Sequence, residues 1–168
     1  MRVGIGFDMH ALVAGRRLVL GGVEIPFPKG LEGHSDADVL THALVDAVLG
    51  AAGAGDIGAR FGTDAAWTRD IRSLRLLEEA VAAVAALGYA VHNADATVVA
   101  EAPRLAPHLG AMRGNLCRAL RVAEGKVNVK ATSAKLLGLI GSGDGIAAFA
   151  VASLVPAAPA VDLPRPGL

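Results

Sequence analysis

Two apolar periodicities alternate along this chain, and their order constrains the fold more than any other feature of the sequence. Apolar residues recur at every second position in some segments, which is typical of strands, and at every third or fourth position in others, which is typical of helices. We expect strands at residues 2–7, 17–20, 23–26, 89–100, 126–132 and 146–155, and helices at residues 35–52, 70–87 and 107–122. This order predicts an α+β fold in which a mixed sheet carries the helices on one face.

Short polar and glycine-containing stretches separate these segments. The two glycines at 21–22 predict the turn of a hairpin, and Ser35, with Asp38 three residues later, predicts the start of the first long helix. Asp70 is the candidate cap of the second helix. The glycine-rich segment 138–145 lacks the form of a P-loop, so we interpret it as a tight turn between strands.

Composition bears on the size and the surface of the domain. The chain has 168 residues, which is a one-domain length, and its end at 156–168 predicts a loose tail, with four prolines in thirteen residues. Hydrophobic residues make up 53% of the chain, although aromatic residues make up only 4%. A domain of this size buries only about 70% of its unfolded surface. The apolar excess is therefore either spread as small methyl groups or buried against other copies of the chain.

Charge and cysteine content exclude several classes of protein. Sixteen Lys and Arg residues balance sixteen Asp and Glu residues, so the basic surplus of a nucleic-acid-binding protein or of a polybasic membrane anchor is missing. One cysteine, Cys117, cannot form an internal disulfide, and the first residues do not resemble a signal peptide. The longest uncharged stretch, 145–161, contains two prolines and is too short to span a membrane. We expect a soluble, cytoplasmic protein with no nucleic-acid or membrane partner.

Acidic and histidine side chains in two segments form a first candidate site. Asp8 and His10 lie two residues apart at the end of the first strand, so they point to the same side. Asp38, His42 and Asp46 are spaced four residues apart, so they form one polar stripe on the first long helix. Each pattern alone is more typical of a solvated surface. Together, however, Asp8, His10 and His42 supply the three-ligand set of a catalytic zinc site, with Asp46 as a partner that would orient the His42 ring.

A second set of residues is suited to anions. His34 and Ser35 stand at the expected start of the first long helix, where free backbone N–H groups and the helix dipole favour phosphate. Thr132 and Ser133 follow a strand and, with Lys135, offer two hydroxyls and an ammonium to phosphate oxygens. Each of these signals is ambiguous by itself.

Several motifs occur together and in one order along the chain. They are G-F-D-M-H at 6–10, I-P-F at 25–27, H-S-D-A-D at 34–38, H-A-L-x-D-A-x-L-G at 42–50, G-D-I-G at 55–58, A-x-x-P-x-x-x-P-H at 100–108 and V-N-V-K-A-T at 127–132. At these spacings the chain closely resembles the 2-C-methyl-D-erythritol 2,4-cyclodiphosphate synthase family of the non-mevalonate isoprenoid pathway. The resemblance covers residues 1–155, which we expect to be the synthase domain.

The resemblance implies roles for the matching residues. Asp8, His10 and His42 match the family's zinc ligands, which implies one Zn²⁺ per subunit. His34 and Ser133 match the groups that stabilise the transition state. The matching substrate contacts are Ser35, Asp56, Ile57, Gly58, Phe61, Ala100, Pro103, Arg104, Leu105, Ala106, Ala131, Thr132 and Lys135.

The resemblance also implies a reaction and an assembly. The reaction is a lyase-class intramolecular phosphoryl transfer: the 2-phosphate of 4-diphosphocytidyl-2-C-methyl-D-erythritol 2-phosphate attacks the β-phosphorus, CMP leaves, and 2-C-methyl-D-erythritol 2,4-cyclodiphosphate forms. The family is a homotrimer with active sites between adjacent subunits and apolar strands around a threefold axis. Such an axis would bury the excess of small apolar residues.

The chain departs from the family's pattern at three places. Lys135 stands where the family usually has a Glu that binds a second divalent ion, so a role for Mg²⁺ or Mn²⁺ is doubtful, and we hypothesise that the Lys135 ammonium supplies part of that charge. The segment at 61–65 differs from the family's F-P-D-T-D. Ser142 and Asp144 replace an Arg and a Glu near the threefold axis, so we expect weak or no binding of an isoprenoid diphosphate in the central cavity.

Two other functions are compatible with these residues. The first is a non-catalytic trimeric protein that binds zinc and nucleotide but has lost turnover because of Lys135. The second is a zinc phosphohydrolase that acts on nucleotide diphosphates, which would need a metal-bound water free to attack.

Overall fold

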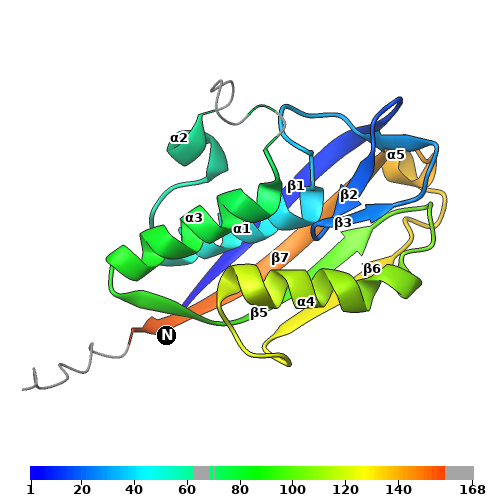
Figure 1. Cartoon of the computed structure of the whole chain (residues 1–168). Helices are drawn as coiled ribbons and strands as arrows, with labels where there is room; N and C mark the ends of the chain where they lie inside the picture. Colours follow the sequence, from blue (N-terminus) through cyan, green and yellow to red (C-terminus); the bar gives the residue numbers. More distant parts are fainter. Residues whose placement is uncertain (63–68, 70, 158–168) are drawn as a thin grey trace, which may run out of the picture.

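A five-stranded sheet in the order β4-β1-β7-β5-β6 forms one layer of the structure, against which the helices pack (Figure 1). The computed structural model describes residues 1–62, 69 and 71–157. The strands of the sheet are β1 (Arg2–Ala14), β4 (Lys29–Leu31), β5 (Tyr89–Val99), β6 (Val127–Thr132) and β7 (Gly145–Pro156). The pair β5 and β6 is parallel and the other neighbouring pairs are antiparallel, which confirms the predicted mixed sheet. The predicted hairpin is also confirmed, as a separate two-stranded sheet of β2 (Leu18–Leu20) and β3 (Val23–Ile25).

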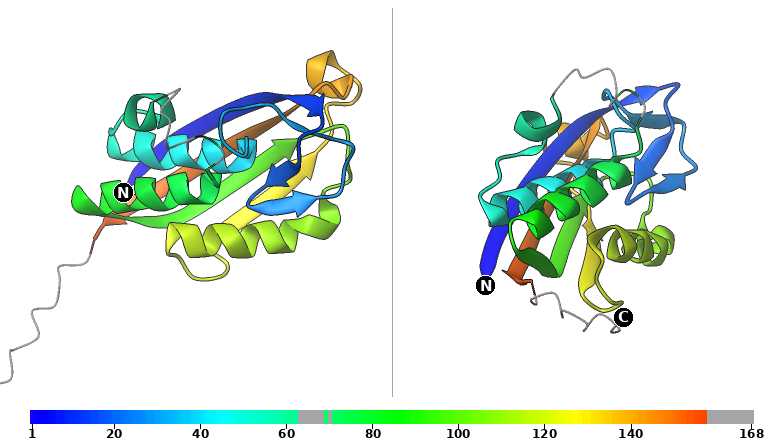
Figure 2. Two further views of the ribbon diagram at one scale, coloured as in Figure 1. Left: turned by 45° about the horizontal axis from the view of Figure 1, so that its top comes forward. Right: turned by 60° about the vertical axis from the view of Figure 1, so that its left-hand side comes forward.

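The long helices cover one face of the sheet, as expected (Figure 2). They are α1 (Val39–Ala52), α3 (Ser73–Ala86) and α4 (Leu109–Leu120), and α4 follows directly on the 3-10 turn η2 (Ala106–His108). Two short helices, α2 (Ile57–Phe61) and α5 (Gly138–Gly141), were not expected, and α5 replaces part of the predicted turn at 138–145. No helix in the described part of the chain is long and apolar enough to cross a membrane.

Glycines on β1 set the distance between the sheet and α1. A Cβ on Gly6 would lie 1.8 Å from the carbonyl oxygen of Ala43, and a Cβ on Gly4 would lie 2.2 Å from that of Ala47. Glycine at these two positions therefore allows the backbone of α1 to lie directly against β1. Because side chains two residues apart share a face of a strand, this same face of β1 continues toward its C-terminal half with polar side chains.

The opposite face of β1 and β7 is apolar and exposed in the single chain. Phe7 and Phe149 are cross-strand partners whose ring centroids lie 4.7 Å apart. The large apolar side chains on β1 and β7 that are 43–72% exposed are Val3, Ile5, Phe7, Met9, Phe149 and Val151. A continuous apolar surface of this kind marks an interaction surface more often than a solvated one.

Two predicted boundaries are wrong. β1 continues to Ala14 rather than ending at Phe7, so Asp8 lies inside the strand and not at its end. Helix α1 begins at Val39 with Asp38 as its N-cap, rather than at Ser35. The Asp38 carboxylate is fully buried and accepts hydrogen bonds from the backbone N–H groups of Thr41 and of both hairpin glycines at 21–22, which explains why it is selected as the cap.

Two other expectations concern residues outside the described part. Helix α3 begins at Ser73, and the predicted cap Asp70 is among the residues that the structure does not describe. Of the predicted tail at 156–168, only residues 156 and 157 are described, and the first of them ends β7. The division of the chain at residue 155 stays a prediction.

Candidate metal and phosphate-binding site

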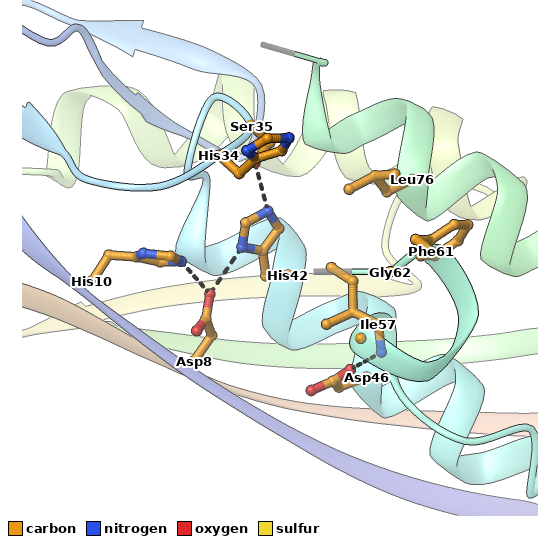
Figure 3. A pocket seen from close by; sticks show the side chains of 11 residues that line it. Asp8, His10, His34, Ser35, His42, Asp46, Ile57, Phe61, Gly62 and Leu76 are labelled. Carbon is orange, nitrogen blue, oxygen red and sulfur yellow. Dashed lines mark hydrogen bonds and ion pairs between the residues drawn. The ribbon is translucent and has the colours of Figure 1, made fainter. Parts of the chain in front are cut away.

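Asp8, His10 and His42 meet where β1 faces α1 (Figure 3). The strand places Asp8 and His10 on one face, and His42 projects toward them from α1. The Asp8 Oδ2 atom lies 3.0 Å from His10 Nε2 and 2.9 Å from His42 Nδ1. One ligand atom from each residue lies within 4.8 Å of the others. The structure thus brings together the three residues that the sequence analysis selected as metal ligands.

The electrostatic environment keeps Asp8 ionised. Burial raises the pKa of the Asp8 carboxyl, but hydrogen bonds from His10 and His42 outweigh burial and hold that pKa well below its ordinary value. The hydrogen bond to Asp8 in turn raises the pKa of His10, against the effect of burial. The carboxylate therefore offers a permanent negative charge, which is the form that a metal ligand requires.

This donor set fits a divalent metal ion. One carboxylate oxygen and two imidazole nitrogens are the three protein groups of a catalytic zinc site, which keeps a further position open for substrate. The side chains of Asp8 and His10 are about one-quarter exposed, so the ligand atoms remain accessible from the adjoining pocket. The arrangement supports a divalent metal site beside the adjoining pocket, which the same three side chains line.

The second ring nitrogen of His42 faces two serine hydroxyls instead of the predicted Asp46. Ser73 Oγ lies 2.8 Å from His42 Nε2, and Ser35 Oγ lies 3.2 Å from the same atom. The Asp46 carboxylate instead accepts a hydrogen bond of 2.8 Å from the backbone N–H of Ile57, and burial raises the pKa of Asp46 (Figure 3). The prediction that Asp46 orients the His42 ring is therefore wrong. The two serines contact the ring, whereas Asp46 holds the start of α2.

A pocket of about 280 Å³ adjoins the three ligands. Its other lining residues are His34, Ser35, Asp46, Ile57, Gly58, Phe61, Gly62 and Leu76. All but two of these were selected from the sequence. Sequence analysis missed Leu76, a buried residue of α3, and Gly62, which ends α2 with a positive φ. Asp56 is the exposed N-cap of α2, where its side chain accepts from Ala59 N, and it does not line this pocket.

The remaining predicted contacts form a second group at the C-terminal ends of β5 and β6. This group comprises Ala100, Pro103, Arg104, Leu105, Ala106, Ala131, Thr132, Ser133 and Lys135, and none of its members lines the 280 Å³ pocket. Arg104, Thr132 and Lys135 are exposed, whereas the side chains of Ala100 and Leu105 are buried in the core. Within one chain the predicted site is therefore divided into two groups on different elements.

Two polar residues near α5 contact each other. Ser142 Oγ lies 2.6 Å from Asp144 Oδ2 and 3.0 Å from the carbonyl oxygen of Leu139. The hydroxyl of Ser142 is thus engaged by acceptors on its own segment. The expected weak or absent binding of an isoprenoid diphosphate near these residues stays a prediction.

Comparisons with known proteins agree with this geometry. The chain matches the model of the YgbB family over residues 1–155. It is 55% identical over 154 residues to the 2-C-methyl-D-erythritol 2,4-cyclodiphosphate synthase of Desulforamulus reducens, and the match covers 92% of this chain and 98% of that protein.

Solved structures are similar over the same range. A 2C-methyl-D-erythritol-2,4-cyclodiphosphate synthase in its CDP-bound form has a TM-score of 0.84 at 36% identity, covering 92% of this chain and 100% of the other. The bifunctional IspDF from Campylobacter jejuni has a TM-score of 0.87 at 40% identity, and the match covers 91% of this chain but only 42% of that longer protein. Because the agreement extends from the first strand to the last, and includes the segments that form the metal site, this protein belongs to the YgbB family.

Proposed function

We propose that this protein is a zinc-dependent 2-C-methyl-D-erythritol 2,4-cyclodiphosphate synthase. It would convert 4-diphosphocytidyl-2-C-methyl-D-erythritol 2-phosphate into the cyclic diphosphate and CMP. The observation that carries this proposal is the convergence of Asp8, His10 and His42 at the edge of a pocket, in a chain 55% identical to a protein named for that activity. The cytoplasmic location expected from the sequence stays a prediction.

The chemistry places few demands on a general base, because the attacking group is already an anionic phosphate oxygen. The protein must hold the attacking oxygen in line with the leaving group and neutralise the charge that develops on phosphorus. A divalent ion held by the Asp8 site would supply Lewis-acid charge stabilisation at the phosphates. The half-buried side chain of His34 lines the same pocket and is placed to donate to a phosphate oxygen, and Ser133 would donate from the second group.

The two ends of the substrate would bind in different places. Ile57, Phe61 and Leu76 give it an apolar wall on the side away from the metal ligands. That wall suits the methylerythritol carbon chain and excludes water from the reacting phosphates. We propose that half-buried Pro103, with the exposed residues Arg104 and Ala106, holds the cytidine end.

We further propose that the active unit is a homotrimer. The apolar face of β1 and β7 needs a partner, and the two groups of predicted contacts lie apart within one chain. Both features have one explanation if the β5–β6 group of one subunit completes the pocket of its neighbour. Sedimentation equilibrium measures the assembly directly, and a monomer at enzyme concentrations that give full activity would overturn this part of the proposal.

Lys135 is proposed to contact the diphosphate directly. Its exposed ammonium lies just after β6, on a residue with a φ of 56°. The single charge of the ammonium, which has no fixed coordination geometry, would replace part of the positive charge that a second divalent ion supplies at the diphosphate. Titration of Mg²⁺ into the wild type and into Lys135→Glu tests this, because we expect a steeper metal requirement in the variant. An equally steep requirement in the wild type would contradict the role of Lys135.

The non-catalytic alternative is not favoured, because relatives that are 52–55% identical to this chain over more than 90% of its length are named as synthases. The decisive assay is release of CMP from the authentic substrate, followed by identification of the second product. Cyclic diphosphate supports the synthase. Retention of nucleotide without turnover would support a binding protein, and free methylerythritol phosphates would support a phosphohydrolase.

A further inference from the structure

The environment of the His42 ring contains more than metal ligands. Its Nδ1 faces Asp8, on the metal side, and its Nε2 faces Ser73 at 2.8 Å, on the side of the protein interior. Ser73 is the first residue of α3 and is completely buried. None of the roles assigned from the sequence includes Ser73.

The hydrogen-bond partners of Ser73 fix the direction of each proton. Ser73 Oγ donates to Asp36 Oδ1, since a carboxylate can only accept, and Asp36 Oδ2 also accepts from the Ser73 backbone N–H at 3.1 Å. A serine hydroxyl has a single proton, so Ser73 Oγ cannot also donate to His42. It must accept from the Nε2–H of the His42 ring.

We propose that Ser73 and Asp36 act as positioning residues that fix the tautomer of His42 for metal binding. With a proton held on Nε2, Nδ1 is the nitrogen that can exchange the proton it donates to Asp8 for a metal ion beside that carboxylate. A metal-bound histidine generally needs such a partner on its other nitrogen, which sets the ring's orientation and raises its basicity. The inference rests on the metal site of the proposed function but not on the reaction.

The surrounding loop supports this network. Ser35 Oγ accepts from Ala37 N at 3.1 Å and lies 3.4 Å from Ser73 Oγ, to which it can donate its own proton. The Ser35 carbonyl accepts from Arg16 Nη2 at 2.8 Å, which holds this loop against the strand that carries His10. Each N–H and O–H group named in this network thus has an acceptor. Ser35 also lies 3.2 Å from His42 Nε2, so it is the group that can replace Ser73 if the latter is lost.

Zn²⁺ affinity and the nitrogen chemical shifts of His42 test the proposal without any assay of activity. Zn²⁺ alone is titrated against a chromophoric chelator into wild type, Ser73→Ala, Asp36→Asn and the double variant Ser35→Ala/Ser73→Ala. Removal of such a partner typically weakens metal affinity by about 10–100-fold. We expect this loss in the double variant and a smaller loss in each single variant. In Asp36→Asn the amide can donate to Ser73, which frees the serine proton for His42 Nε2 and favours the wrong tautomer.

The ring-nitrogen spectrum distinguishes positioning from a general structural defect. In the zinc-loaded wild type we expect ¹⁵N shifts of a ring protonated at Nε2 and bound through Nδ1, assigned by the signals lost in His42→Asn. The double variant should show a mixture of ring states. The matched control is Thr41→Val, which removes an equally buried hydroxyl that donates to Asp38 from the neighbouring position of α1.

Two outcomes would overturn the proposal. One is wild-type Zn²⁺ affinity and wild-type His42 shifts in the double variant. The other is an equal loss of affinity in Thr41→Val, which would indicate general destabilisation. Failure of the synthase assay alone would reject the proposed function and leave these metal measurements unaffected.

Discussion

The contact between Gly6 and α1 gives the sharpest prediction. A Cβ at this position would lie 1.8 Å from the carbonyl oxygen of Ala43, and contacts shorter than 3.0 Å are essentially never found for real Cβ atoms. The obstacle is helix backbone, so no side-chain rotation can relieve it. In Gly6→Ala, therefore, α1 must move away from β1 by about 1 Å or more.

Two separate losses follow from this displacement. Overpacking of a rigid core costs about 1–3 kcal/mol, and the backbone contact places Gly6→Ala near the upper end of that range. The displacement also separates His42 on α1 from Asp8 and His10 on β1. Metal–ligand distances tolerate only about 0.2 Å, and a misplacement of 1 Å can cost roughly 100-fold in rate. We expect a loss of about 3 kcal/mol in unfolding free energy and a fall in activity on the order of 100-fold.

Urea unfolding measures the loss of stability, while a zinc titration and the CMP-release assay measure the displacement of His42 on the same preparation. Gly110→Ala is the matched control, because a Cβ there, in the first turn of α4, would meet nothing within 4 Å. That variant should be as stable as the wild type or more stable by up to about 1 kcal/mol. The reasoning is refuted if Gly6→Ala retains wild-type stability together with wild-type zinc affinity.

Three further predictions concern the cap, the sheet surface and the assembly. Asp38→Ala leaves three backbone donors, two of them in buried hydrogen bonds, without their acceptor. We expect a loss of about 3–5 kcal/mol in the free energy of unfolding measured with urea, whereas a loss below about 1 kcal/mol would contradict the structure. Asp95 is half-exposed, and the hydrogen bond from Lys130 is the main cause of its lowered pKa. Ionised Asp95 therefore stabilises the fold at pH values above its unfolded-state pKa, and this stabilisation is lost as the pH falls through its folded-state pKa. Solvent screening limits this stabilisation to less than about 1 kcal/mol. In urea unfolding, Asp95→Asn should therefore be slightly less stable than the wild type at pH 7 and equally stable at pH 2. Phe149→Asp places a charge in the exposed apolar face and should yield a monomer of lower activity in sedimentation experiments, while an intact trimer would argue against this face as the interface.

Local patterns predicted the elements better than their ends. Asp8 and His10 are the first acidic and histidine side chains in β1, and the strand was predicted to end before them, at Phe7. The strand nevertheless continues, because β7 provides hydrogen-bond partners as far as Ala11 and β4 does so beyond it. Ser35 and Asp38 are both good N-cap residues, and the choice between them is made by the hairpin glycines, which are distant in sequence.

The site was predictable to the extent that its residues obey a local spacing or a family motif. The two-residue spacing of Asp8 and His10 was enough to place them on one face of a strand. Their meeting with His42 depends on how closely α1 packs on the sheet, which no local pattern specifies. Ser73 was missed for a related reason: its hydrogen bond to His42 joins residues 31 positions apart, and in the sequence it is one serine near a helix start.

The alternation along β1 has an evolutionary consequence. Gly6 and Asp8 point toward α1, while Phe7 and Met9 between them point to the exposed apolar face. Insertion or deletion of one residue before Asp8 would exchange the two faces, turning the metal ligands outward and forcing phenylalanine against the helix backbone. On the exposed apolar face of this strand a substitution changes one contact, whereas a change in length moves every side chain to the other face. The number of residues between Gly6 and His10 should therefore vary between relatives far less readily than the identity of the apolar residues on the exposed face.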